Sequence, residues 1–271
     1  MRQKFLSNLS EKLGHYVLAP FAYLYNIIML LYTSIKAFRI ERRNSKQIPF
    51  KVILLQAYFT GIQALPIIII AALVLGIVVV VELSTILPKF GAGSYVERLS
   101  IITIVRETAP IIVALIIIGR SGTAIATEIG NMKLNREVDV MDSLGINTDF
   151  YIVFPRIAGV TFAIFCLTII FITTAVAGGF MVPKFLSILP KNALFSKFIS
   201  SIYLEDVIVL CLKAVFFGMA IALVSAYQGL CVKRSFTEVP KMATRGVVNS
   251  ILMCFFLNVL ISLYILPVSG L

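Results

Sequence analysis

Charged residues and the usual catalytic residues are scarce in this chain. Only 14% of its 271 residues are charged, whereas about a quarter are charged in an ordinary soluble domain. The one histidine, His15, stands in a basic N-terminal stretch, so a serine–histidine–acid set is excluded. No HExxH, CxxC or phosphate-loop motif occurs. We therefore expect no enzymatic chemistry, no metal or cofactor site, and no ATP binding through a phosphate loop.

The cysteines form no recognisable site either. They lie far apart, without metal-ligand spacing, and three of the four fall inside apolar runs. We expect Cys166, Cys211, Cys231 and Cys254 to act as small hydrophobic residues.

Apolar residues dominate the composition. Hydrophobic residues make up 59% of the chain, and its mean hydropathy is +0.99. The apolar runs have the roughly 20-residue length that a helix needs to cross about 30 Å of hydrocarbon, and they are too uniform for barrel strands. The sequence predicts an all-α integral membrane protein. A net charge of +11 does not indicate nucleic-acid binding, because the basic residues cluster at span ends.

Five segments qualify as membrane spans. They are residues 66–87, 99–119, 157–180, 206–230 and 247–267. A sixth segment, residues 16–35, is uncharged and long enough to cross, but basic residues both precede and follow it. Because short basic loops stay cytoplasmic, both flanks belong inside. We therefore interpret residues 16–35 as an interfacial or re-entrant helix.

The basic residues also orient the chain. With the N-terminus in the cytoplasm, seventeen Lys and Arg residues lie on the cytoplasmic side and five on the opposite side. The C-terminus then lies outside. We divide the chain into a basic N-terminal segment, residues 1–60, which holds the interfacial helix, and a five-span domain, residues 61–271. The longest polar interlude is a cytoplasmic loop at about residues 120–156.

Three charged residues fall within the predicted spans. Arg106 and Glu107 stand about eight residues into the second span and Lys213 about eight residues into the fourth. All three would share a depth of roughly 12 Å below the outer boundary, so Glu107 and Lys213 could pair. Pro110 leaves the Arg106 carbonyl without its helical donor and favours a kink there. The cluster is interpreted as a polar site on the transport path or as a structural ion pair.

The cytoplasmic loop predicts a second functional element. Its apolar stripe shifts register at residues 131–135, which indicates that the second span continues to about Gly130 and a separate helix follows. Asn135 is the expected N-cap, and Gly145 the expected C′ residue. A helix lying on the bilayer would favour Lys and Arg, whereas this one is net acidic. The pattern favours a cytoplasmic protein partner.

Small residues predict two places of close helix packing. One is a run at the inner end of the second span, from Gly119 through Gly122 to Gly130. The other is the pair Gly178 and Gly179 in the third span.

The same central region resembles the signature of the MlaE-type permeases, the membrane subunits of ABC transporters that work with MCE-domain proteins. The family pattern has an Arg-Glu-x-x-Pro opening, a Gly-Arg-x-Gly-(Ser/Thr)-Ala turn, a Glu-Ile-Gly-x-Met segment and a closing Pro-Arg. It is met here by Arg106, Glu107, Pro110, Gly119, Arg120, Gly122, Thr123, Ala124, Glu128, Ile129, Gly130, Met132, Pro155 and Arg156. The likeness covers most of residues 61–250.

The resemblance implies a homodimeric permease in the inner membrane of a double-membraned bacterium, with its C-terminus in the periplasm. It implies an ATPase subunit that binds the ATP and docks on a cytoplasmic coupling helix, an MCE-domain protein on the outer side, and a phospholipid or other hydrophobic cargo. The expected coupling residues are Glu128, Arg136, Glu137, Val138, Asp139, Met141, Asp142 and Leu144.

Two alternative functions remain open at this point. One is a secondary transporter driven by an ion gradient through Glu107 and Lys213, although five spans and no internal repeat are unusual for that class. The other is an assembly or insertion factor that moves no cargo.

Overall fold

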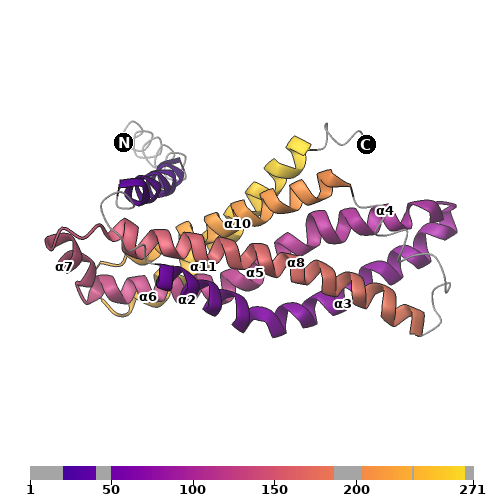
Figure 1. Ribbon diagram of the computed structural model, residues 1–271, viewed down its shortest axis with the longest axis horizontal. Helices are drawn as coiled ribbons and strands as arrows, with labels where there is room; N and C mark the ends of the chain where they lie inside the picture. Colours follow the sequence, from indigo (N-terminus) through magenta and orange to yellow (C-terminus); the bar gives the residue numbers. More distant parts are fainter. Residues whose placement is uncertain (1–20, 41–49, 186–202, 234, 266–271) are drawn as a thin grey trace, which may run out of the picture.

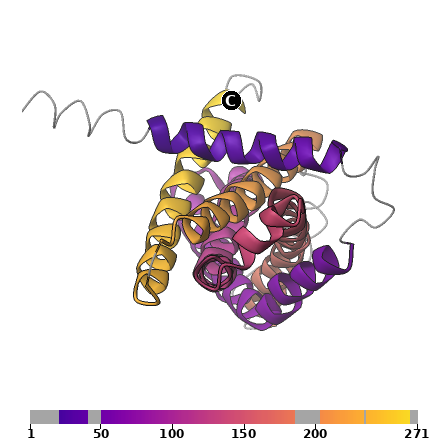
Figure 2. The same ribbon diagram turned by 90° about the vertical axis from the view of Figure 1, so that its left-hand side faces the viewer.

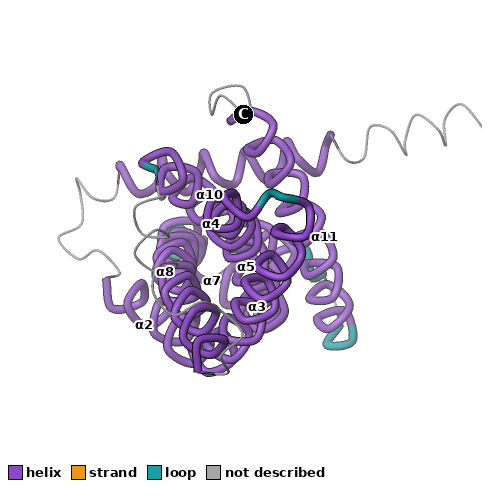
Figure 3. Tube along the Cα trace, turned by 90° about the vertical axis from the view of Figure 1, so that its right-hand side faces the viewer, coloured by secondary structure: helices purple, strands orange, loops and turns teal. Residues whose placement is uncertain are grey.

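The computed structural model describes residues 21–40, 50–185, 203–233 and 235–265. Within these ranges every regular element is a helix. Six helices are long and apolar enough to cross a membrane. Viewed from one end, the described chain is helix joined by short loops (Figure 3). The prediction of an all-α integral membrane protein is confirmed.

The long helices that follow the N-terminal one run along the bundle (Figure 1). The first combines α2 (Phe50–Gly61), a 3₁₀ turn η1 (Ile62–Ala64) and α3 (Leu65–Ile86). The second combines α4 (Val96–Ile101), α5 (Ala109–Ile117) and α6 (Thr123–Leu134), with π-helical segments η4 (Ile102–Thr108) and η5 (Ile118–Gly122) between them. The others are α8 (Phe154–Phe185), α10 (Leu204–Leu230) and α11 (Glu238–Ile265).

The predicted spans coincide with these stretches. Each of the five overlaps one long helix. The first stretch begins sixteen residues before its predicted start, at Phe50, and the second continues fifteen residues beyond its predicted end, to Leu134. The prediction that this stretch ends near Gly130 was therefore wrong by about one turn. Pro267, the predicted end of the fifth span, lies outside the described residues.

The N-terminal helix lies across the bundle. It covers Phe21–Ile40, five residues beyond the predicted end, while residues 16–20 lie outside the described ranges. Figure 2 shows this helix perpendicular to the long helices, at the end of the bundle that also carries α7 (Glu137–Ser143). The Tyr227 hydroxyl accepts a hydrogen bond from Asn26 at 3.1 Å, and the ring of Phe38 stacks on that of Phe154, with 4.3 Å between the centroids.

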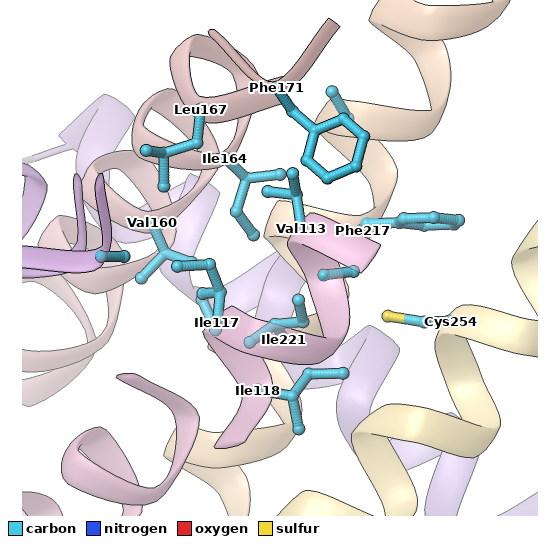
Figure 4. Packing of buried hydrophobic residues seen from close by; sticks show 14 of the residues in the cluster. Val113, Ile117, Ile118, Val160, Ile164, Leu167, Phe171, Phe217, Ile221 and Cys254 are labelled. Atoms are coloured by element: carbon cyan, nitrogen blue, oxygen red, sulfur yellow. The ribbon is translucent and has the colours of Figure 1, made fainter. Parts of the chain in front are cut away.

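The apolar core surrounds α10. In the most apolar 18-residue window of that helix, 61% of the residues are buried, against 17% in α11. Figure 4 shows Phe217 and Ile221 of α10 packed against Val113 and Ile117 of α5 and Phe171 of α8. The four cysteines are free, and Cys254 is buried in this core.

Glycines set the closest helix contact, which joins α3 and α8. A Cβ on Gly76 would collide with the backbone carbonyl of Ala175, and one on Gly179 would lie 2.7 Å from the carbonyl oxygen of Gly76. A Cβ on Gly178 would lie 2.7 Å from Leu73. The predicted packing role of Gly178 and Gly179 is confirmed. Among the glycines of the second stretch, Gly122 and Gly130 face close neighbours, whereas Gly119 faces open space.

We expect Gly76→Ala to destabilise the protein by about 1–3 kcal/mol or more, because overpacking against a backbone carbonyl forces the two helices apart. Gly119→Ala is the matched control, since its methyl group meets no atom within 4 Å and alanine is a better helix former than glycine. Thermal unfolding in detergent measures both. Equal midpoints for the two variants would contradict the assigned contact.

Candidate functional site

The intramembrane charges gather where the second long stretch departs from α-helical geometry. The segment η4, Ile102–Thr108, is π-helical, and α5 begins directly after it with Pro110 in its first turn. Proline has no N–H to donate to the carbonyl of Arg106, four residues earlier. That carbonyl instead accepts a hydrogen bond of 2.9 Å from Nζ of Lys213, on α10. The freed carbonyl thus becomes part of a polar site between two helices.

Lys213 is fully buried, and each proton of its ammonium group has an acceptor. Besides the Arg106 carbonyl, Nζ lies 2.8 Å from Oε1 of Glu107 and 2.9 Å from Oγ of Ser262 on α11. An ammonium group carries three donors, so its hydrogen-bonding capacity is complete. A buried lysine in a membrane bundle requires such partners. The structure brings Glu107 and Lys213 together, as the shared depth predicted.

Glu107 is held by residues of two neighbouring helices, α10 and α11, but remains open on one side. Oε1 accepts hydrogen bonds from Lys213 and, at 3.0 Å, from Ser262, while Oε2 accepts one of 3.1 Å from Asn258. Even so, 40% of the Glu107 side chain is exposed. The carboxylate is therefore fixed in place and still accessible to a ligand.

Arg106 points to a different partner from its neighbour. Its Nε donates to Oδ1 of Asp206, whose other oxygen accepts a hydrogen bond of 2.7 Å from Arg98. Asp206 is completely buried. Glu205 lies further away, at 3.6 Å from Nη2 of Arg106, and is half exposed. Three cations and three carboxylates therefore balance across the cluster, which is the condition for placing charges at this depth.

Asp206 is the residue of this cluster that the sequence interpretation missed, because it marks the predicted start of a span. It stands at the third helical position of α10, and its carboxylate also accepts a hydrogen bond of 3.0 Å from the backbone N–H of Tyr203. A carboxylate at this position is ordinary helix capping. The available signal was the excess of cations over carboxylates in the predicted cluster, with Arg106 and Lys213 set against Glu107 alone.

The short helix α7 forms the second candidate site. Arg136, with φ of 60°, is its N-cap, so the prediction of Asn135 in that role was wrong; Asn135 instead ends α6, and its backbone N–H donates to the carbonyl of Asn131. The helix ends as predicted at Gly145, whose φ is 73°. Because the N–H groups of residues 145 and 146 bond to the carbonyls of residues 142 and 141 at 3.1 and 2.9 Å, the end is a complete Schellman motif.

The two apolar faces of α7 have different surroundings. Val138 is buried, and Met141 packs against the core from a half-buried position. These two residues hold α7 on the bundle. Val140 is 55% exposed and Leu144 71% exposed, so both are available to a partner.

The predicted acidic residues stand around this exposed apolar surface. Glu137, Asp139 and Asp142 are exposed. Asp139 pairs with Lys133 at 2.6 Å, and Asp142 accepts a hydrogen bond of 2.9 Å from Thr148. Glu128 does not belong to α7, because it lies on α6 and pairs with Arg156 at 2.8 Å. Seven of the eight predicted coupling residues therefore lie in or next to α7.

Removal of the Lys213 ammonium group should lower the stability of the protein, because the cluster depends on this group. Lys213→Ala leaves the Glu107 carboxylate and the Arg106 carbonyl without their buried donor, and we expect a loss of roughly 3 kcal/mol. The double variant Lys213→Ala with Glu107→Ala should lose less than the sum of the two single changes. Unfolding measurements on all four proteins give the coupling free energy, and simple additivity would show that the pair does not interact.

Asp206 and Glu205 provide a matched comparison beside Arg106. Asp206→Asn keeps the side-chain shape but removes the buried counter-charge of two arginines, so we expect a loss of about 3 kcal/mol. Glu205→Gln changes a half-exposed side chain at 3.6 Å and should cost less than about 1 kcal/mol. The unfolding free energies of the two variants test the assignment. A larger loss of stability from Glu205→Gln than from Asp206→Asn would show that Glu205, and not Asp206, is the main counter-charge of Arg106.

Comparisons with known proteins agree with this architecture. The model of the permease MlaE family matches residues 53–264. A probable ABC transporter permease protein of Rickettsia bellii is 31% identical over 79% of this chain and 82% of its own length. A probable ABC transporter permease protein of Synechocystis is 27% identical over 83% of this chain and 82% of its own length. The intermembrane phospholipid transport system permease protein MlaE of Haemophilus influenzae is 25% identical over 79% of this chain and 82% of its own length. The chain is a multi-pass membrane protein that belongs to the MlaE family of permeases.

Proposed function

We propose that this chain is the permease subunit of an ABC transporter that moves phospholipids between two membranes. The observation that carries the proposal is the extent of the family match, since residues 53–264 include both the intramembrane cluster and α7. The name of the Haemophilus influenzae relative supports a phospholipid as cargo. The names of the Rickettsia and Synechocystis relatives support the ABC transporter class.

The intramembrane cluster is the proposed contact with the cargo. Lys213 and Arg106 are buried and each is paired with a carboxylate, whereas Glu107 keeps 40% of its side chain exposed. A polar group held open between apolar helices offers a place for a lipid headgroup while the acyl chains remain in an apolar environment. The same fixed geometry makes it a poor proton carrier, because both oxygens of Glu107 already accept hydrogen bonds.

The proposed partners follow from the two ends of the bundle. An ATPase subunit binds the ATP and docks on the exposed face of α7 in the cytoplasm, and an MCE-domain protein lies on the opposite side. A second copy of the chain completes the permease. The helix Phe21–Ile40 lies across the bundle at the α7 end (Figure 2), which supports an interfacial position. We place this end in the cytoplasm of a bacterial inner membrane because of the distribution of basic residues, so that the N-terminus is cytoplasmic and the C-terminus periplasmic.

Reconstitution tests the function directly. Proteoliposomes that contain the chain with its ATPase should transfer a fluorescent phospholipid only when ATP is hydrolysed. The same chain without the ATPase, under an imposed pH gradient, is the control for a secondary transporter. ATP-independent movement driven by that gradient would contradict the proposal.

The coupling helix makes a further prediction. Leu144→Ser removes the most exposed apolar side chain of α7 and should reduce retention of the ATPase about tenfold, the usual effect of losing one interface anchor. The amount of ATPase that remains bound per permease during purification measures this. Phe90→Ser is the control, because Phe90 is 82% exposed but belongs to the turn after α3, at the opposite end of the bundle. Equal retention of the ATPase by the two variants would show that α7 is not part of the docking surface.

A further inference from the structure

A cavity with polar side chains in its walls opens toward the end of the bundle that carries α7. It holds about 470 Å³ and lies between the α2–η1 segment and the η5–α6 segment. Its walls include Gln56, Gln63, Arg120 and Glu128. Arg120 stands thirteen residues after Glu107 on the same helical stretch, which corresponds to about 20 Å along the membrane normal. The cavity is therefore separate from the intramembrane cluster.

Arg120 is fixed in place but has no counter-charge. It donates hydrogen bonds to the backbone carbonyl of Phe59, at 3.2 Å, and to Oε1 of Gln63. A guanidinium carries five N–H donors, so three remain for a ligand. No carboxylate of the described residues lies within ion-pair distance of it. A half-buried cation held this way is organised in advance to bind an anion.

Glu128 provides a negative group further toward the cytoplasm. It follows Arg120 by eight residues, or about 12 Å along the helix, and side chains of both residues line the cavity. One carboxylate oxygen pairs with Arg156. The side chain is nevertheless 58% exposed, so the carboxylate can also receive a cation from the cavity.

An apolar strip leads from the cavity toward the middle of the bilayer. Ile67, Ile70 and Val74 follow Gln63 by four, seven and eleven residues, so they share one face of the helix. All three are exposed. Along the membrane normal the order is therefore apolar strip, cation and carboxylate.

We propose that this cavity binds the headgroup of an amine-bearing zwitterionic phospholipid from the inner leaflet. The phosphate binds Arg120, the ammonium lies beside Glu128, and an acyl chain follows the apolar strip. Arginine matches phosphate oxygens with two parallel hydrogen bonds, which suits a fixed guanidinium. The order of the three groups is that of acyl chain, phosphate and amine in an inner-leaflet lipid. The proposal rests on the proposed function, because it gives the permease a cargo site on the cytoplasmic leaflet.

The absence of tryptophan from the sequence permits a local measurement. Phe59 lines the cavity and is 47% exposed, so Phe59→Trp introduces a single fluorophore at the site. Full-length protein in uncharged maltoside detergent is titrated with brominated phosphatidylethanolamine or brominated phosphatidylglycerol. Bromine quenches the indole only in contact, so lipid at the Glu107 cluster, about 20 Å away, gives no signal.

Three further changes in this background test the two contacts. Arg120→Gln should weaken the binding of both lipids about tenfold, which is the effect of losing one charged hydrogen-bonding group. Glu128→Gln should weaken the binding of phosphatidylethanolamine several-fold and leave the binding of phosphatidylglycerol unchanged. Arg39→Gln, which alters an exposed arginine of the N-terminal helix at the same end, is the control and should change neither.

Each contrary result has a definite meaning. Equal effects of Arg120→Gln and Arg39→Gln would overturn the site, as would equal effects of Glu128→Gln on the two lipids. Displacement of the brominated lipid by an equal concentration of glycerophosphoethanolamine would show that a soluble phosphate compound binds there instead. If Arg120→Gln does not fold, Arg120→Lys replaces it, because lysine keeps the charge without the planar fork. Arg120→Lys should weaken the binding of both lipids by less than about tenfold. Binding needs no ATPase, so failure of ATP-driven transfer would contradict the proposed function and leave this test intact.

Discussion

The bond between Lys213 and the carbonyl of Arg106 is the interaction on which the intramembrane site depends. Pro110 removes the N–H that would otherwise satisfy this carbonyl, and an unsatisfied carbonyl in a membrane bundle costs several kcal/mol. The ammonium of Lys213 meets that need at 2.9 Å, but it brings a positive charge into the core. Glu107 balances the charge at 2.8 Å. Backbone geometry therefore accounts for the presence of a charged pair between three apolar helices.

Asp206 balances the buried charge of Arg106, as Glu107 does for Lys213. The first turn of a helix presents unpaired N–H groups, and a carboxylate in that turn accepts from one of them. In α10 that carboxylate accepts from Tyr203, Arg98 and Arg106 together. The capping group of one helix is thus the counter-charge of another. With Arg106 held there, Glu107 is free to face Lys213, so the two adjacent residues serve different partners.

Local signals in the sequence predicted much of this arrangement, while contacts between distant segments decided the rest. Apolar run length located the long helices, and Gly145 located the end of α7, because both depend on neighbouring residues. The pairing of Glu107 with Lys213 was predictable from equal depth. By contrast, nothing local to Asp206 distinguishes a capping residue from a buried counter-charge, and the role of Ser262 and Asn258 depends on the rotation of α11. The shift of the N-cap from Asn135 to Arg136 reflects a left-handed backbone at Arg136 that asparagine would have suited better.

The second long stretch joins the proposed sites mechanically. Its residues contribute Glu107 to the intramembrane cluster and Arg120 and Glu128 to the cavity, and the stretch then leads through Leu134 to α7. Two π-helical segments interrupt it, one at Glu107 and one at Arg120. A π-helical segment adds a residue to a turn, and such segments frequently occur at functional sites. A force applied to α7 would reach Arg120 before Glu107, and a π-helical segment lies at each of these two residues. This order agrees with a permease in which the cytoplasmic partner acts first on the inner cavity and then on the cluster deeper in the membrane.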